Sequence, residues 1–323
     1  MKKLMNLAIA SGLFVQGFHE DYNEVRRFLE DHDLDGIEMI IYGDYKVESM
    51  PPDLIYGHHL LYWPNWMNFW LGDREALLKD FLNDQNMDAY YGMKTQKDMI
   101  DYYKKEFEIA KILDSDYMVY HVSHTSFEEV FSFDHKYGDQ EVMATSVEVL
   151  NQVFIGDGPL LLLENLWWPG LNFQDPELTR WLLGQIHYKN KGLVLDIAHL
   201  MATNPLITTM DEGVDYILEV LDKLGDLVED IKVIHLNKTI AGPYLQQDHK
   251  DKQEAFRHKK DLMEGFGMIY EHISQIDSHK PFDHPRIMEI IDRVQPESVV
   301  YELKADTLEA LSEAIKQQNK YIN

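Results

Sequence analysis

The sequence predicts an α/β protein folded as a (β/α)8 barrel, in which eight parallel strands close into a ring and each is followed by a helix. Short apolar runs alternate with longer amphipathic stretches along the whole chain, which is the pattern of repeated strand and helix units. Four of these runs end in an acid or a histidine. In such barrels the carboxyl ends of the strands share one face, which carries the catalytic loops.

Taken in order, the apolar runs and the amphipathic stretches give eight strands and the helices between them. Val25, Phe28 and Leu29 recur at helical spacing after the first run, and Ile100 and Tyr103 do so in a longer stretch. An aromatic loop is expected after the third strand. The expected strands are residues 4–10, 36–41, 56–61, 117–121, 160–163, 193–195, 231–234 and 298–303. The expected helices are residues 21–31, 95–113, 140–154, 175–187, 211–224, 285–294 and 307–318.

One stretch is too long for a minimal barrel. Residues 239–282 separate the seventh strand from the helix at 285–294 and contain an expected helix at 253–276. Long insertions after a barrel strand form lids or substrate walls. We therefore expect residues 1–323 to form a single barrel domain with a lid-like insertion over its mouth.

Composition limits the chemistry that the chain can perform. Cysteine is absent, so any metal must be held by His, Asp and Glu. The formal net charge is −26, from 56 acidic and 30 basic residues. Nucleic-acid binding takes most of its affinity from Lys and Arg, so a nucleic-acid partner is not expected.

The amino-terminal residues 1–12 combine two lysines with a short apolar run, as a secretory signal does. The run is broken by Asn6, however, and the barrel needs it as its first strand. No run reaches the roughly 20 apolar residues of a membrane span. We expect a cytoplasmic protein that does not enter a membrane, and a homo-oligomer is compatible with the sequence.

The side chains that end the strands are expected to meet at one mouth. A buried acid or histidine is unfavourable unless a partner or a metal satisfies it, and mixed carboxylate and imidazole sets suit zinc or manganese. One to three ions are plausible with so many ligands. The candidate metal ligands are His59, His121, Glu164, Asp196, His199, His235, Asp277, His279 and Glu302.

Four short motifs resemble those of the xylose-isomerase-like barrels, a superfamily that includes sugar isomerases and epimerases and the endonuclease IV enzymes. They are Leu163-Glu164-Asn165, Leu195-Asp196-Ile197-Ala198-His199, Ile234-His235-Leu236-Asn237 and Tyr301-Glu302. In the isomerase branch the resemblance implies one metal on Glu164, Asp196, His235 and Glu302. It also implies that Glu164 and Glu302 exchange a proton at the carbon next to a carbonyl and that His199 contacts the sugar.

The endonuclease branch adds ligands that resemble other residues of this chain. His59 and His121 resemble its early histidines, and Asp277-Ser278-His279 resembles its Asp-x-His pair. This resemblance implies two or three ions and attack of hydroxide on phosphorus. The Asp-x-His pair comes much later here than in that family, and His235-Leu236-Asn237 is followed by Lys238-Thr239 instead of the family's Asp-Ser-Lys.

Some assignments remain open between a site role and an ordinary structural role. His58 is an alternative to His59 as a metal ligand, and Asp248-His249 is an alternative to the Asp-x-His pair. Glu38 could reach the same pocket or be a surface acid. The tryptophans of the mouth loops either pack or form an aromatic wall for a sugar. The expected substrate-binding residues are Trp63, Trp66, Trp168, Asn165 and His199.

These observations predict a divalent-metal-dependent isomerase or epimerase of a small sugar or sugar-like polyol, with Glu164 and Glu302 as the catalytic pair. The alternatives are an endonuclease-IV-like multinuclear zinc phosphoesterase and a non-catalytic sugar-binding barrel. Fold alone does not choose among them, because function is determined by the site.

Overall fold

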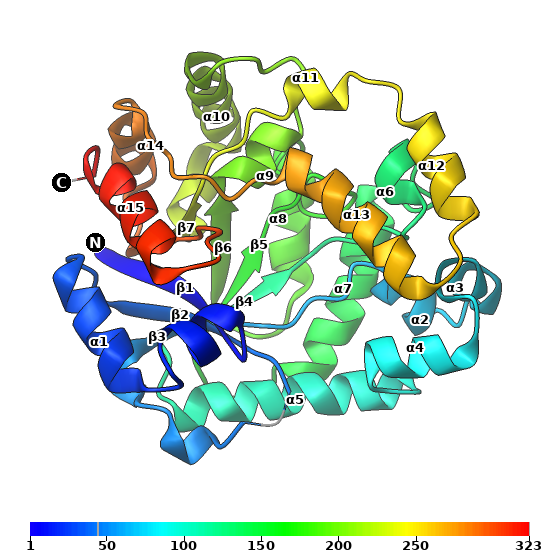
Figure 1. Ribbon diagram of the computed structural model, residues 1–323, viewed down its shortest axis with the longest axis horizontal. Helices are drawn as coiled ribbons and strands as arrows, with labels where there is room; N and C mark the ends of the chain where they lie inside the picture. Colours follow the sequence, from blue (N-terminus) through cyan, green and yellow to red (C-terminus); the bar gives the residue numbers. More distant parts are fainter. Residues whose placement is uncertain (44, 323) are drawn as a thin grey trace.

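Eight parallel strands form a closed barrel in the computed structural model, which describes residues 1–43 and 45–322 (Figure 1). Each strand pairs with its sequence neighbours, and β1 pairs with β8 to close the ring. The predicted (β/α)8 barrel is confirmed. The strands are β1 (Lys2–Ile9), β2 (Gly36–Ile41), β3 (Ile55–His59), β4 (Tyr117–His121), β5 (Leu160–Glu164), β6 (Lys191–Asp196), β7 (Ile231–Leu236) and β8 (Ser298–Tyr301).

Helices surround the barrel and connect its strands (Figure 1). The α-helices are α1 (Tyr22–Asp31), α2 (Trp66–Trp70), α3 (Arg74–Phe81), α4 (Asp84–Tyr91), α5 (Gln96–Ile112), α6 (Glu129–Ser132), α7 (Asp139–Val153), α8 (Pro176–Gln185), α9 (Ile197–Ala202), α10 (Met210–Leu224), α11 (Gly242–Leu245), α12 (Lys250–Arg257), α13 (Leu262–Ile276), α14 (Ile287–Val294) and α15 (Leu308–Asn319). A π-helical turn covers Leu13–Gly17, and 3-10 turns cover Val47–Ser49, Pro52–Leu54 and Gly225–Asp230. Among the described residues no helix is long and apolar enough to cross a membrane.

Alternation along each strand decides which side chains point into the barrel. A cluster of apolar side chains fills its interior and includes Val119, Val194, Val233 and Val300. Two residues further along the same strands come His121, Asp196, His235 and Glu302. The polar side chains at the strand ends therefore continue the inward-facing rows and converge above the apolar interior.

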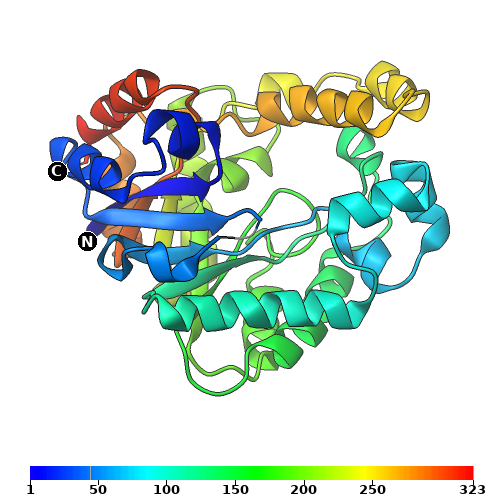
Figure 2. The same ribbon diagram turned by 60° about the horizontal axis from the view of Figure 1, so that its bottom comes forward.

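The insertion after β7 contains α11, α12 and α13; in Figure 1 it runs from α11 to α12, beside α6, and α13 returns from there toward the strand ends. Figure 2 shows α12 and α13 on the side of the molecule opposite α5. The single helix predicted at 253–276 is wrong, because α12 ends at Arg257 and Asp261 caps a new helix by accepting from the Glu264 backbone N–H. Part of the segment expected as an aromatic loop after the third strand is helical, as α2, and two further helices that were not predicted, α3 and α4, follow it.

Candidate metal centre

Glu164 lies at the centre of the converging side chains. It ends β5, pairs in register with His121 of β4, and is fully buried. Its Oε2 atom is 3.2 Å from His59 Nε2 and 3.0 Å from His121 Nε2. Its Oε1 atom is 3.2 Å from His235 Nδ1 and 3.4 Å from His199 Nδ1. Each carboxylate oxygen thus faces two imidazoles.

The first group that could hold an ion is His59, His121 and Glu164, with one ligand atom of each lying within 4.8 Å of the others. His59 Nδ1 is 3.0 Å from the Leu60 carbonyl oxygen, to which it can donate, so Nε2 is free to face Glu164. His58, the competing histidine, is bonded to Glu106 at 2.9 Å and is not part of this group. Adjacent strand residues point to opposite faces, which explains the separation.

The second group comprises Glu164, Asp196, His235 and Glu302, again with ligand atoms within 4.8 Å of one another. Asn237 Nδ2 donates to Asp196 Oδ2 at 3.0 Å and to Glu302 Oε2 at 3.3 Å, which fixes the two carboxylates. Asp196 Oδ1 accepts from the His199 backbone N–H at 2.7 Å and so caps α9. The cap makes the chain turn directly from β6 into α9 and brings His199 back over the strand end.

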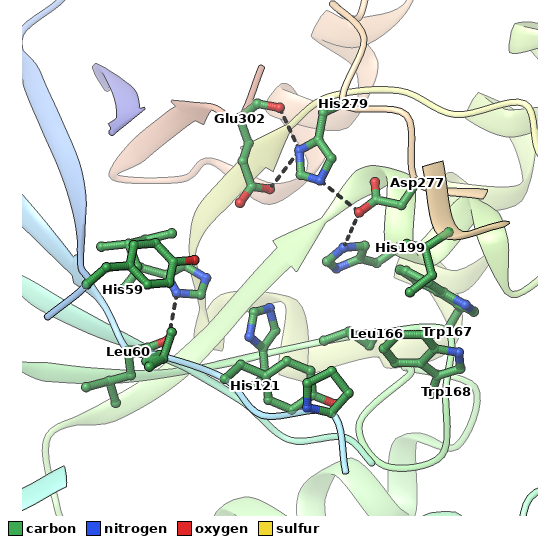
Figure 3. A pocket seen from close by; sticks show the side chains of 16 residues that line it. His59, Leu60, His121, Leu166, Trp167, Trp168, His199, Asp277, His279 and Glu302 are labelled. Atoms are coloured by element: carbon green, nitrogen blue, oxygen red, sulfur yellow. Dashed lines mark hydrogen bonds and ion pairs between the residues drawn. The ribbon is translucent and has the colours of Figure 1, made fainter. Parts of the chain in front are cut away.

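A third cluster lies nearer the insertion and contains His199, Asp277 and His279. Asp277 Oδ2 is 2.8 Å from His279 Nε2 and 3.5 Å from His199 Nε2 (Figure 3). Asp277 Oδ1 is buried and has no hydrogen-bond partner. Asp277 is the residue directly after α13, so the insertion itself delivers this carboxylate to the site.

The surrounding acids raise the pKa values of two histidines in the cluster. Burial lowers the pKa of His235, but the charges of Glu38 and Glu164 outweigh burial and raise the pKa well above the usual value. For His279 burial is likewise outweighed, here by Asp277 and Glu302, and its pKa rises to about 10. The surrounding carboxylates thus favour positive charge at these imidazoles.

Two of the acids have shifted pKa values in opposite directions. Burial raises the pKa of Glu302 to about 7, although His235 and His279 act against this. Burial also disfavours the charged form of Glu164, but the charges of His121 and His235 prevail and hold its pKa well below the usual value. Glu164 is therefore charged at the centre of the cluster, whereas the pKa of Glu302 lies near neutral pH.

The donor set fits divalent cations. Its ligand atoms are imidazole nitrogens and carboxylate oxygens, as zinc and manganese prefer, and Glu164 offers one oxygen to each of two groups. The unpartnered Asp277 Oδ1 is a further buried acceptor that an ion would satisfy. The acids and histidines expected to share a mouth do so, and their role as ligands stays a prediction.

A cavity of about 270 Å³ opens above the cluster. Tyr62, Trp167 and Trp168 form part of its wall, while His121, Asp277 and Glu302 are among the polar residues that line it (Figure 3). A second cavity of about 360 Å³ shares Ile273 of α13 with the first and extends to Lys304. Among the described residues, no Lys or Arg lines the first cavity.

Three residues expected to bind substrate lie elsewhere or are already engaged. Trp63 is buried edge-on against Tyr102 and Tyr103, and the Trp66 indole donates to the Ser123 carbonyl oxygen at 2.7 Å. Neither lines the cavity, since their loop continues into α2 and packs inward. Asn165 is buried and occupied by the backbone of Asp196, to which it donates at 3.0 Å and from which it accepts at 2.8 Å.

Trp168 and His199 do line the cavity, and so does Trp167. The competing pair at 248–249 lies away from the cluster, because the His249 ring packs on Tyr244 and His272 of the insertion.

The sequence left Glu38 open between a residue of the pocket and a surface acid. It is fully buried on β2 and forms a further ligand-capable group with His59 and His235. Its position in the second strand, between the apolar residues 37 and 39, indicates that its side chain points into the barrel.

The fold and the cluster together define a (β/α)8 barrel with a buried acid and histidine centre at the carboxyl ends of its strands. A family model described as xylose isomerase-like TIM barrel matches residues 89–316, and the chain belongs to this family. The resemblance of the four sequence motifs is thereby confirmed. No curated protein sequence matches the chain.

Solved structures share the fold at low sequence identity. AsfvAP, in the crystal structure of AsfvAP:AG, has a TM-score of 0.55 and 14% identity, and the match covers 100% of this chain and 99% of that one. The IOLI protein with a binding zinc atom has a TM-score of 0.52 and 15% identity, with 99% and 96% covered. Endonuclease IV from Thermus thermophilus has a TM-score of 0.48 and 15% identity, with 100% and 99% covered.

Proposed function

We propose that this protein is a metal-dependent hydrolase of small phosphate esters, with two or three divalent ions at the centre described above. The observation that carries this proposal is the position of Glu164, whose two oxygens face two different sets of histidines. A carboxylate placed in this way suits a bridge between ions. Sites with two ions hold the attacking and the leaving oxygen of a displacement at phosphorus.

The residues that would hold the ions follow from the three clusters. His59, His121 and Glu164 would hold one, and Glu164, Asp196, His235 and Glu302 a second. The cluster of His199, Asp277 and His279 would hold a third. Bound zinc or manganese would supply positive charge to the phosphoryl group and activate water for attack on it.

The other residues of the site position these groups and exclude water. Asn237 holds Asp196 and Glu302 at a fixed separation through its two donated hydrogen bonds. Tyr62, Trp167 and Trp168 give the cavity an apolar wall, which lowers the local polarity and strengthens electrostatic interactions inside. Ile273 of α13 lines both cavities, which supports a role of the insertion as a lid.

A small substrate is favoured over nucleic acid. The cavity of about 270 Å³ is slightly smaller than usual ligand pockets, which are about 300 to 1,000 Å³. The net charge is −26, and among the described residues no Lys or Arg lines this cavity to meet a phosphate backbone. Positive charge for a phosphate group would come from the ions.

A second candidate function is isomerisation or epimerisation of a small carbohydrate by proton exchange between Glu164 and Glu302. It is favoured by the aromatic wall beside the four-ligand group, since aromatic rings stack on the C–H faces of sugars. It is disfavoured by the enclosure of Glu164, because a base must reach its proton within hydrogen-bond distance and both oxygens of Glu164 already face histidines.

Metal analysis followed by two assays separates the candidates. The purified protein would be saturated with zinc or manganese, dialysed, and analysed for ions per chain. Two or three ions together with hydrolysis of bis(4-nitrophenyl) phosphate or 4-nitrophenyl phosphate support the proposal. One ion together with epimerisation of a ketose supports the second candidate and contradicts the first.

Glu164→Gln provides the matched test of the bridge. Glutamine keeps the size of the side chain but removes the charge, so the variant is expected to lose at least one ion per chain and on the order of 100-fold in turnover. A wild-type protein that retains no metal after saturation would overturn both metal-dependent candidates and leave the non-catalytic sugar-binding barrel.

A further inference from the structure

A row of residues crosses the barrel interior just below the metal centre. Asn6 of β1 pairs in register with Glu38 of β2, Glu38 with Gly57 of β3, and Gly57 with Tyr117 of β4. Interior positions of these barrels are usually filled by branched apolar side chains. Glu38 is fully buried in this row, and a buried carboxylate is unfavourable unless it is paired or hydrogen-bonded.

The row contains partners for each oxygen of Glu38. Tyr117 Oη donates to Glu38 Oε2 at 2.8 Å, and Asn6 Nδ2 donates to Oε1 at 3.4 Å. Gly57 makes the first of these bonds possible, because a Cβ atom at this position would lie 2.6 Å from Tyr117 Oη and 2.5 Å from its ring. The tyrosine therefore reaches across β3 through the space that the glycine leaves.

Glu38 also reaches the opposite side of the barrel. Its Oε2 atom is 3.1 Å from His235 Nε2, and both residues are fully buried. The other nitrogen of this imidazole, Nδ1, is 3.2 Å from Glu164 Oε1 and 3.7 Å from Glu302 Oε2. His235 thus presents one nitrogen to Glu38 and the other to the four-ligand group.

We propose that Glu38 is a positioning residue that orients His235 for metal binding. This inference rests on the proposed metal centre. A neutral imidazole has one donor and one acceptor nitrogen, and the hydrogen bond made by one determines which is available to a metal. Glu38 accepts the proton of Nε2, so that the lone pair of Nδ1 points at the ions, and Tyr117 holds Glu38 in the orientation that this requires.

The chain supplies a matched control on the other face of β3. His58 Nε2 is 2.9 Å from Glu106 Oε2, and both residues are buried. This pair has the same chemistry as His235 and Glu38, but His58 and Glu106 belong to none of the candidate ligand groups. Glu106→Gln therefore reports the effect of removing a buried acid from a histidine without touching the centre.

The test is a zinc titration against a competing chelator for the wild type, Glu38→Gln, Tyr117→Phe, their double variant and Glu106→Gln. Loss of a residue that orients a ligand weakens metal binding about 10- to 100-fold, so we expect this for Glu38→Gln with an unchanged number of ions per chain. Tyr117→Phe should weaken zinc binding less than Glu38→Gln does. The double variant should bind zinc as weakly as Glu38→Gln alone. Glu106→Gln should bind zinc as the wild type does. The visible spectrum of the cobalt-loaded protein should change in Glu38→Gln and not in Glu106→Gln.

Each other outcome contradicts a defined part of the argument. If the wild type binds no zinc, both the proposed metal centre and the proposed role of Glu38 are wrong. If the wild type binds zinc and Glu38→Gln binds it equally well, only the positioning role of Glu38 is wrong. Loss of one ion per chain in Glu38→Gln would instead make Glu38 a ligand. Should Glu38→Gln fail to fold, unchanged zinc affinity in Tyr117→Phe overturns the proposal.

Discussion

At the scale of single residues, the site depends on which face of a strand each side chain occupies. His58 and His59 are neighbours in sequence, yet one is bonded to Glu106 and the other faces Glu164. Sequence alone left this choice open, because the register of the third strand determines it. The ends of the apolar runs did indicate Glu164 and Asp196, since an acid that closes a buried strand has few structural reasons to be there.

Gly57→Ala tests the space that the row beneath the site requires. The added Cβ would lie 2.5 Å from the Tyr117 ring, so the ring must move and the bond from Tyr117 to Glu38 must lengthen. Overpacking of this kind costs about 1 to 3 kcal/mol of unfolding free energy, which urea denaturation would measure. Gly184→Ala in α8 is the control, because the added carbon has no neighbour within 4 Å outside the adjacent residues and the nearby backbone of its own helix. An unchanged midpoint for Gly57→Ala would contradict the packing described here.

Asp80→Asn tests a buried acid outside the metal centre. Asp80 is almost fully buried and accepts from Asn65 Nδ2 and from the Phe127 backbone N–H, at 2.6 and 2.8 Å. Burial raises its pKa from 3.8 to about 7. Between these pH values the unfolded chain has released the proton and the folded chain has not, so the contribution of Asp80 to stability falls as pH rises from about 4 to about 7.

Asparagine keeps an accepting oxygen and removes the charge. We expect Asp80→Asn to raise the melting temperature at pH 8 relative to the wild type and to have little effect at pH 4.5. The gain in unfolding free energy at pH 8 is at most about 4 kcal/mol, since one pKa unit corresponds to about 1.36 kcal/mol. Asp84→Asn, which changes an exposed acid paired with Arg74, is the control. A variant that is destabilised equally at both pH values would show that the charge is not what matters.

At the scale of elements, capping residues made some helices predictable. Thr95 and Thr307 accept from backbone N–H groups at the starts of α5 and α15, and these helices begin within one residue of the predicted positions. Helix α2 was not predicted, because its aromatic residues were assigned to a loop, and no helix was predicted over residues 74–91, where α3 and α4 lie. Asn83, which caps α4, and Gly92, which ends it with a positive φ, were available signals.

The insertion is attached to the barrel by a histidine that should make it sensitive to acid. His272 of α13 is buried, with Nε2 3.0 Å from the Val130 carbonyl oxygen and Nδ1 2.7 Å from Tyr244 Oη. Burial lowers its pKa to about 4, and positive charge on His249 and Lys252 acts in the same direction. Because the unfolded value is higher, the stabilisation is complete above about pH 6.5 and is lost as pH falls toward 4.

Hydrogen exchange followed by mass spectrometry measures this effect. We expect amides of residues 262–276 to lose protection at pH 5 relative to pH 7.5, after correction for the intrinsic exchange rate, while amides of β5 and β6 stay protected. In His272→Phe the protection of α13 should be lower at pH 7.5 and should change little with pH, because phenylalanine does not titrate. Uniform loss of protection in barrel and insertion would point to global unfolding instead.

At the scale of the whole molecule, the alternation of strands and helices was sufficient to predict the closed barrel, because each repeat carries its own apolar pattern. The pattern also predicted that acids and histidines from six strands would share one mouth. It could not predict how Glu164 would be surrounded, since its four imidazole neighbours come from β3, β4, α9 and β7. That arrangement depends on side-chain directions across the barrel, which is a property of the assembled fold.

Metal binding should stabilise the whole barrel, because the ions would join residues from β3 to β8. A ligand present at 100 times its dissociation constant stabilises the folded state by about 2.7 kcal/mol, so saturating zinc should raise the melting temperature and a chelator should lower it.

Binding should also release protons, because the pKa values of His235 and His279 are raised by neighbouring acids and these imidazoles must lose a proton to bind an ion. Zinc affinity is therefore expected to increase from pH 6 to pH 8. Calorimetry in two buffers of different ionisation enthalpy counts the released protons, and Glu164→Gln should show a smaller thermal shift. A zinc affinity independent of pH would mean that the ions bind elsewhere on this acidic chain.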